Sequence, residues 1–453
     1  MKNTLLTLMI ALTFSAMADE SNTNNSVSLT MESDSVSDFI AELQVAIYQH
    51  PTFLAAEASV AQSSQLVNIA KSNRRPQLSL QTSTTNRFSS SFDDKFSFFE
   101  SSPIKEQTNA SLVIRQLLFD SFATSHQIKQ QKNTLLADQL VQEQQVFALA
   151  LKMITNCLDT ASYYLLKEMI TDSVQRHTEI TEQIKVRVDS GRAPMRELTR
   201  ANARLAEAQA KQLNTELSYE SVLAEFRQLM PNTMACKKMI ALSTKDLVLD
   251  SRTAVDNALA YNLSIQESNM RIKAAEENLM RIKANRWPKV SLKVQGDKYN
   301  SEEFLTRQLD DYDFYAGINF DMDLYSGGRK RSEIKGAKEQ LNEVRFKKDE
   351  LVKNITASTE SLLSELKNGD KRVEIFKQAF IANDMSRDNL RLQFVSSNVS
   401  LLELLQAERD YLESSENMVF NQRSVLLAGF TELALLGKLM NYINKNSKGS
   451  SGN

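Results

Sequence analysis

The stretch FYAGINFDMDL, residues 314–324, alternates apolar and polar side chains without interruption. Its even-numbered positions hold Phe, Ala, Ile, Phe, Met and Leu, and its odd-numbered positions hold Tyr, Gly, Asn, Asp and Asp. A period of two over about ten residues is typical of a barrel strand with lipid on one side and water on the other. We therefore expect a membrane strand here. The alternative is a half-buried hairpin of a water-soluble protein.

The same alternation marks residues 290–297. It is looser in two segments of the first half, one with Leu78 and Leu80 and one with Leu112 and Ile114. Four strands cannot close a barrel, and an open sheet edge cannot face lipid. If these strands lie in a membrane, each chain must combine its strands with those of other chains.

The sequence contains two copies of one unit. A shift of 212 residues places Pro76 on Pro288, and a shift of 206 places Phe119 on Tyr325. The smaller second shift implies a longer loop in the first copy, between its proline and Phe119. Internal duplication of this kind predicts two repeats of one structural unit.

Each copy has the same expected order: a helix of about 35 residues, a strand pair and a long helical hairpin. We expect the first helices at about 36–75 and 252–287, the strand pairs at about 77–119 and 289–325, and the long helices at about 121–189 and 328–394. Each long helix would span roughly 100 Å at 1.5 Å per residue. Apolar residues at 351, 355, 362, 366 and 373 have the spacing of a coiled-coil seam. The fold class is therefore mainly α, with a β-barrel contribution.

The N-terminus has the features of a secretory signal peptide at residues 1–18. Lys2 precedes an apolar run, and Ala16-Met17-Ala18 precedes Asp19. No later run of about 18 apolar residues predicts a membrane helix. The expected organisation is a periplasmic segment at 19–35, the first repeat at 36–230, an equatorial linker at 231–250, the second repeat at 251–438 and a flexible tail at 439–453.

Charge and composition exclude several functions. The net charge of −2 makes no electrostatic case for nucleic-acid binding. The three histidines are not spaced for a metal site, and no glycine-rich phosphate loop is present. We expect neither a cofactor nor an enzyme. Cys157 and Cys236 permit one disulfide, with two separate buried thiols as the alternative.

Several segments resemble the TolC-like outer-membrane channel family. They are LLFD at 117–120, LYSGGR at 324–329, ELTRA at 197–201 and ELLQA at 403–407. The resemblance implies a homotrimer with a twelve-stranded outer-membrane barrel and a periplasmic α-helical tunnel. It also implies a periplasmic adaptor, an inner-membrane ABC or proton-driven pump, and a role in efflux or type I secretion. The alternative is a periplasmic coiled-coil scaffold that does not span the membrane.

The resemblance also implies functional residues at the distal end of the tunnel. Its narrowest point would lie at Glu403 and Gln406, with Glu197 and Arg200 in the equivalent places of the first copy. The family often has two carboxylates at this constriction, and this chain keeps one of them.

Two further sets of residues are candidates. The distal turns are expected to contact the adaptor through Gly191, Arg192, Ser396 and Ser397. The aromatic residues at the strand ends are expected at the boundary between lipid and water, and they are Phe119, Trp287 and Tyr325.

Overall fold

A computed structural model describes residues 34–87, 105–230, 236, 253–303, 307–396 and 399–447. The expected signal peptide lies outside these residues. So do most of the 19–35 segment, most of the 231–250 linker, and Ser397.

The two copies contain the same elements in the same order. The first consists of α1 (Asp34–Gln49), α2 (Pro51–Ser72), β1 (Gln77–Arg87), β2 (Lys105–Phe119), α3 (Ala123–Asp189) and α4 (Met195–Leu229). The second consists of α5 (Ala254–Tyr261), α6 (Leu263–Ala284), β3 (Lys289–Glu303), β4 (Arg307–Asp321), α7 (Arg329–Val395) and α8 (Leu401–Leu435), and α9 (Leu439–Ser447) follows it.

Three of the four matching helix pairs have equal lengths, and the exception is α1 with 16 residues against α5 with 8. Helices α2 and α6 have 22 residues each, α3 and α7 have 67, and α4 and α8 have 35. The strands depart from this match, because β2 ends at Phe119 and β4 at Asp321. The match of Phe119 with Tyr325 nevertheless holds in the corner that follows, because the left-handed residues Ser121 and Phe122 before α3 correspond to Gly327 and Gly328 before α7 at the same shift of 206. Residues 322–328 separate β4 from α7, whereas only 120–122 separate β2 from α3.

The first helix of each copy is broken, where one continuous helix was expected. Pro51 has no N–H to donate, and His50 caps the new helix by accepting a hydrogen bond at Nδ1 from the backbone N of Thr52, at 3.2 Å. In the second copy Asn262 has the same role, and its Oδ1 accepts from the backbone N of Ser264 at 2.9 Å. The asparagine break was not predicted, since Asn262 stands inside an otherwise helical pattern.

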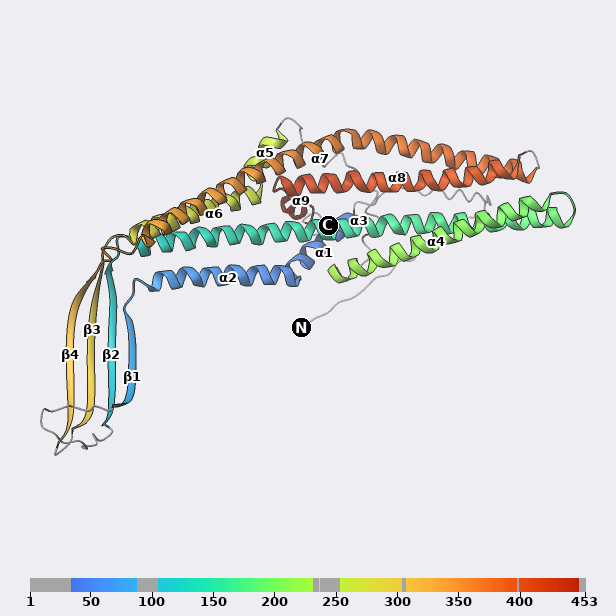
Figure 1. The fold of residues 1–453 in the computed structure, drawn as a ribbon. Helices are drawn as coiled ribbons and strands as arrows, with labels where there is room; N and C mark the ends of the chain where they lie inside the picture. Colours follow the sequence, from blue (N-terminus) through green and yellow to red (C-terminus); the bar gives the residue numbers. More distant parts are fainter. Residues whose placement is uncertain are drawn as a thin grey trace, which may run out of the picture.

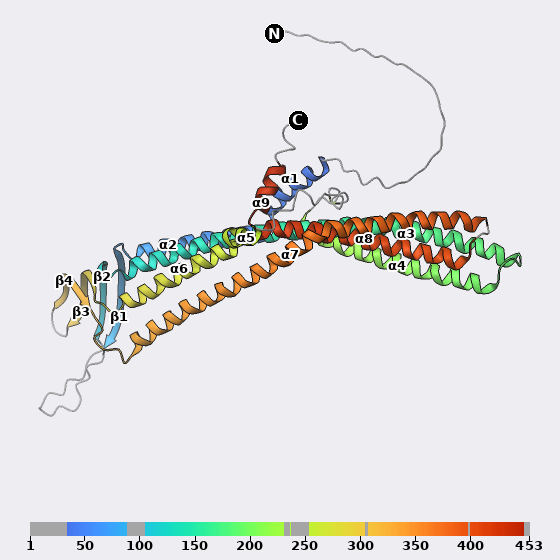
Figure 2. The same cartoon turned by 90° about the horizontal axis from the view of Figure 1, so that it is seen from above.

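The molecule is a long helical rod with a sheet at one end (Figure 1). Helices α2, α3, α6 and α7 extend from the sheet, and α3 and α7 continue to the far end, where α4 and α8 turn back. Seen from above, α1 and α9 project beside the rod near its middle (Figure 2). Among the described residues, no helix has both the length and the apolar run needed to cross a membrane.

The largest hydrophobic core lies at this middle level and joins α1, α3, α4, α8 and α9. Leu439 and Ile443 of α9 are both buried in it. The expected flexible tail at 439–453 is thus helical over its first nine residues. Apolar side chains four residues apart on one helix face give this segment a surface to pack.

Candidate functional site

The sheet is open at both sides. Its strand order is β1-β2-β3-β4, with antiparallel pairing throughout. Among the described residues, β1 and β4 each pair with one neighbouring strand, so each leaves a row of backbone hydrogen-bonding groups without a partner there. Both predicted strand pairs are therefore present, and they join into one sheet through the pairing of β2 with β3.

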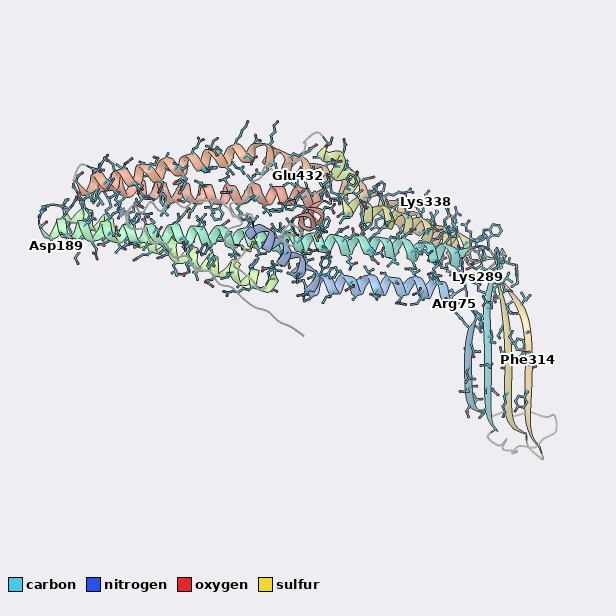
Figure 3. All side chains as sticks on the ribbon, turned by 180° about the vertical axis from the view of Figure 1, so that it is seen from behind. Arg75, Asp189, Lys289, Phe314, Lys338 and Glu432 are labelled. Atoms are coloured by element: carbon cyan, nitrogen blue, oxygen red, sulfur yellow. A yellow bond between two sulfur atoms is a disulfide. The ribbon has the colours of Figure 1, made fainter. Side chains whose placement is uncertain are left out.

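One face of the sheet is apolar and exposed. Residues opposite one another across strands share a face. The register aligns one row of Leu78, Ile114, Val294 and Ala316, and a second row of Leu80, Leu112, Gly296 and Phe314. Leu78 is 67% exposed and Phe314 is 74% exposed, and Figure 3 labels Phe314 on the sheet. An apolar face of this extent requires a cover of lipid or protein.

The other face is polar and carries its own hydrogen-bond chain. The Lys293 Nζ donates to the Tyr315 hydroxyl at 2.7 Å, and that hydroxyl donates to Gln295 Oε1 at 2.6 Å. Gln295 Nε2 in turn donates to the Asp297 carboxylate at 2.8 Å. The predicted two-faced character of the strands is thus present in the sheet.

The three predicted boundary aromatics are all exposed where the sheet meets the helices. Phe119 is 46%, Trp287 64% and Tyr325 89% exposed. A fourth residue, Phe122, is 67% exposed and contacts Phe119 edge-on, with ring centroids 5.9 Å apart. Sequence reasoning assigned Phe122 to the long helix. Its left-handed backbone, with φ of +69°, instead places it at the corner before α3.

Over the residues that the structure describes, the distal helices form a row that is open on both sides. Helix α4 packs on α3, α3 on α8, and α8 on α7. The outward faces of the two end helices carry large exposed apolar residues. They are Leu213 and Leu217 of α4, and Ile375, Met385 and Leu392 of α7. The helical part therefore repeats the feature of the sheet, since both ends of the row need a partner.

The predicted constriction residues lie on the surface near the distal end. Glu403 and Gln406 are exposed, and the Ser400 hydroxyl caps α8 by accepting from the backbone N of Glu403 at 3.3 Å. Gln406 Nε2 donates to Asp410 Oδ1 at 2.7 Å.

Their counterparts in the first copy also lie near the distal end. Glu197 is half-buried and Arg200 is exposed. Neither forms an ion pair with any residue that the structure describes.

The distal turns have the predicted positions. Gly191 has a φ of +73°, which glycine adopts without steric cost. The backbone N of Arg192 donates to the carbonyl of Arg187 at 2.8 Å, which closes the end of α3. Ser396 ends α7, and its hydroxyl donates to the carbonyl of Gln393 at 2.9 Å. Gly191, Arg192 and Ser396 are all exposed.

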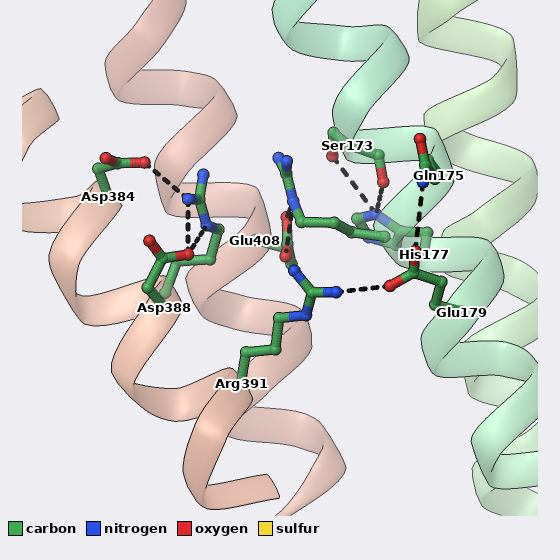
Figure 4. Close-up of polar contacts among 10 residues, drawn as sticks. Ser173, Gln175, His177, Glu179, Asp384, Asp388, Arg391 and Glu408 are labelled. Carbon is green, nitrogen blue, oxygen red and sulfur yellow. Dashed lines mark hydrogen bonds and ion pairs between the residues drawn. The ribbon is translucent and has the colours of Figure 1, made fainter. Parts of the chain in front are cut away.

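A buried ion pair between α3 and α8 joins the two copies at a level between the distal turns and the middle of the rod. Arg176 Nε of α3 donates to both carboxylate oxygens of Glu408 of α8, at 3.1 Å each (Figure 4). The Glu408 side chain is fully buried and that of Arg176 is 12% exposed. A second pair nearby, Arg391 with Glu179, is much more exposed. Sequence reasoning missed Arg176, because one arginine among many on a charged helix gives no signal.

A second arginine continues this cluster onto α7. Arg387 Nη2 binds Asp384 at 2.8 Å and Asp388 at 2.7 Å. Its guanidinium lies 4.0 Å from the ring centroid of Tyr411, and the guanidinium of Arg176 lies 5.2 Å from the same centroid. The cluster therefore links α3, α7 and α8 at one level.

A buried carboxyl lies near the middle of the rod. Glu432 of α8 is 1% exposed, and neither of its carboxylate oxygens has a hydrogen-bond partner among the described residues. Burial raises the pKa of Glu432 to about 7, against a smaller opposite effect of Lys438. Figure 3 labels it close to the level where α9 packs.

The cysteines are joined in the structure. Cys157 of α3 and Cys236 form a disulfide with a Cα–Cα distance of 5.2 Å, and both are fully buried in the central core. The bridge attaches the segment that follows α4 to the middle of α3.

The histidines have structural contacts. His126 Nδ1 lies 2.6 Å from Glu277, which links α3 to α6, and His177 hydrogen-bonds the carbonyl of Ser173 at 2.9 Å. Over the part of the chain that the structure describes, no three His, Cys, Asp or Glu side chains are placed to hold a metal ion.

Comparisons with known proteins agree with this geometry. The family model described as outer membrane efflux protein matches residues 42–231 and 254–436. The chain is 21% identical over 396 residues to the outer membrane protein TolC of Salmonella enteritidis, which covers 82% of this chain and 76% of that protein. It is 19% identical over 387 residues to the outer membrane efflux protein BepC of Brucella suis, covering 85% and 82%.

Solved structures share the fold. The CmeC outer membrane channel of Campylobacter jejuni aligns with a TM-score of 0.75 at 14% identity, covering 96% of this chain and 94% of that one. The outer membrane protein VceC of Vibrio cholerae aligns with a TM-score of 0.72 at 16% identity, covering 89% and 96%.

Proposed function

This chain belongs to the outer membrane efflux protein family, and from that premise we propose that three copies assemble into one export duct. It is an outer-membrane protein with a large periplasmic portion, and it acts as a transport duct rather than as an enzyme. The observation that carries the proposal is the two-faced sheet with two open edges.

Closure of the sheet requires other copies of the chain. The edge of β4 in one copy would pair with the edge of β1 in the next, so that three copies contribute twelve strands. The apolar face would then meet lipid and the polar face would line the lumen. Phe320 and Tyr312 are eight residues apart on this apolar face, about 27 Å along the strand. A membrane barrel has an apolar band of about 25 Å.

The boundary aromatics fit this orientation. Phe119, Trp287 and Tyr325 would lie at the periplasmic surface of the membrane, and Phe122 would join them. The helices would then extend from that surface into the periplasm.

The helical row would close in the same way. Leu213 lies 18 residues after the start of α4, and Ile375 lies 20 residues before the end of α7, so both are at a similar depth from the distal turns. Ala206 of α4 and Met385 of α7 likewise lie at a similar depth from the distal turns. These exposed apolar residues at matching depths would let α4 of one copy pack against α7 of the next.

Cysteine cross-linking tests this assembly. We expect Leu213→Cys with Ile375→Cys to give disulfide-linked dimers and trimers in the outer-membrane fraction. Leu213→Cys with Phe346→Cys is a control, because Phe346 is equally exposed on α7 but lies near the sheet. The trimer would be refuted if only monomers were found after cross-linking and if the native mass in a detergent extract were that of one chain.

We propose that the duct is narrowest at Glu403 and Gln406, near the distal turns. Three copies would bring three Glu403 carboxylates to one level, where they would attract cations. Glu197 and Arg200 would make contacts between copies, since they make no ion pair within the described part of one chain. Glu403→Ala should raise single-channel conductance in planar bilayers and lower the cation preference. Unchanged conductance and cation preference would remove Glu403 from the constriction.

We propose that the distal turns contact a periplasmic adaptor, which connects the duct to an inner-membrane pump. Gly191, Arg192, Ser396 and Ser397 are the candidate contacts, and the first three are exposed at the end of the rod. Site-specific photo-cross-linking from position 192 should capture one periplasmic protein. A matched probe at Asn368, midway along α7, should not capture it.

Two cargo classes fit such a duct: small toxic compounds expelled by efflux and a protein exported by type I secretion. The family assignment favours efflux. A deletion strain should therefore become more sensitive to detergents and lipophilic drugs. An unchanged sensitivity together with loss of one large protein from the medium would favour secretion instead.

A further inference from the structure

The polar face of the sheet carries a row of like charges. The register places Arg115 of β2 directly opposite Lys293 of β3. Gln77 and Gly317 complete the row on the outer strands. Like charges directly opposite one another destabilise a sheet, so this arrangement costs stability. Arg115 is exposed and forms no ion pair with any residue that the structure describes.

A row of opposite charge lies four residues further from the helices. Asp297 of β3 is opposite Asp313 of β4, and Ser111 and Gln81 complete that row. The two rows are about 14 Å apart along the strands. That separation exceeds the Debye length of about 8 Å at physiological salt, so each row acts mainly by itself.

The side chains between the rows are held in place. Lys293 lies 5.2 Å from the Tyr315 ring centroid as well as donating to its hydroxyl. The chain through Gln295 then fixes Asp297. This chain of hydrogen bonds runs along one face of β3 and β4 and connects the Lys293 ammonium to the Asp297 carboxylate through Tyr315 and Gln295.

We propose that Arg115 and Lys293 form a basic ring in the lumen of the barrel, which attracts anionic solutes at its own depth. This inference rests on the trimeric duct proposed above, in which three copies place six cations at one depth. Charges that line a confined aqueous pathway raise the local concentration of ions of opposite sign. The ring would favour carboxylate- or phosphate-bearing solutes as they leave the duct, independently of the constriction at its other end.

A cysteine beside the ring reports the local potential. Ser79 is exposed, lies on the same face and is two residues from Gln77. In Ser79→Cys, the reaction rates of the anionic sulfonatoethyl and the cationic trimethylammonioethyl methanethiosulfonates are compared on intact cells. The native cysteines are buried and bonded to each other, so they do not react.

If the ring is present, replacing both of its cations (Arg115→Gln with Lys293→Gln) should lower the ratio of the anionic to the cationic reaction rate at least about threefold at 0.1 M salt. At 1 M salt the decrease should be much smaller, because the charges are screened. Lys298→Gln is the matched control, because it removes one lysine from the same strand but from the apolar face. It should leave the ratio unchanged.

The outcomes separate the two proposals. An equal ratio in the parent and the double variant would refute the ring while leaving the duct intact. No labelling of Ser79→Cys by either reagent, in a chain that is folded in the outer membrane, would show that the polar face is not lumenal and would refute the duct.

Discussion

The two long hairpins, α3–α4 and α7–α8, have the same backbone lengths but different bases. The first hairpin is fastened at its base by the disulfide between Cys157 and Cys236. At a shift of 206 residues the second hairpin has Leu363 and Tyr442 in these places. Tyr442 packs edge-on against Phe430 and forms no covalent link.

The side chains packed between the two helices of each hairpin also differ between the copies. Phe226 is fully buried in the first hairpin, and its counterpart in the second is the buried carboxyl of Glu432. Tyr163 corresponds to Gly369, where the backbone of α7 approaches Val425 of α8 so closely that a Cβ would lie 2.6 Å from its Cγ2. One duplicated backbone therefore has one base that is covalently linked and another that contains a buried carboxyl and a close approach of two helices.

The largest expected effect comes from removing the covalent link. Cys157→Ala with Cys236→Ala should lower the free energy of unfolding by about 4.5 kcal/mol, because the bridge closes a loop of 79 residues. Thermal unfolding followed by circular dichroism in detergent measures it. Dithiothreitol should reproduce the loss in the parent protein and have no effect on the variant.

The link between the hairpins comes next. Arg176→Met should cost about 4 kcal/mol, because it leaves the fully buried Glu408 carboxylate without its partner. Arg391→Met is the control on the same cluster. Its partner Glu179 is well exposed, so that variant should lose less than about 1 kcal/mol. Equal losses in both variants would contradict the assigned burial.

The pH response of the second hairpin is the third test. The pKa of Glu432 is about 7 in the folded protein and about 4.3 in an unfolded chain, so the folded state binds the proton more tightly. Its contribution to stability is complete below about pH 4 and is lost as pH rises through 7, a change of roughly 3–4 kcal/mol.

Glu432→Gln should remove that change. The measurement is the difference in unfolding free energy between parent and variant at pH 5 and pH 8, both in detergent. Glu343→Gln on α7 is the control, because its ion pair with Lys347 keeps the pKa of Glu343 low and the group charged across this range. A difference that is the same at both pH values would mean that Glu432 does not titrate there.

The smallest expected effect concerns the close approach of α7 and α8. Gly369→Ala should cost about 2 kcal/mol by overpacking against Val425. Gly336→Ala on the same helix meets no atom within 4 Å and should instead stabilise by about 0.5–1 kcal/mol. Adding Val425→Ala to Gly369→Ala should recover part of the loss, as unfolding in denaturant would show.

Much of the fold was predictable because its signals are periodic. The ends of α3 and α7 fall within two residues of the expected ones, since Gly191, Pro194 and the serines after Phe394 stop helices by their own chemistry. The two strand pairs were predicted from the alternation of apolar and polar residues. This pattern is informative because a shift of one residue in register would move every side chain to the opposite face of the sheet.

The site residues were predictable only where their structure depends on their neighbours in the sequence. The turns follow from the residues that build them. Arg176 and Glu408 are 232 residues apart in sequence, and only the packing of α3 against α8 makes them partners. Glu432 has the same limit, because its burial depends on contacts from several helices. The earlier end of β4, at Asp321, was not predictable, because it depends on strand pairing and not on the residues of the corner.

The equal lengths of α3 and α7, and of α4 and α8, make the rod a molecular ruler. The two distal turns must lie at the same depth in the cell envelope. A change in the length of one helix would therefore move one turn out of level with the other. A lineage with a wider envelope would have to insert whole turns into both halves of the gene together. Length in this architecture therefore evolves in paired steps, and a designer who wishes to extend the rod must make the same insertion in each half.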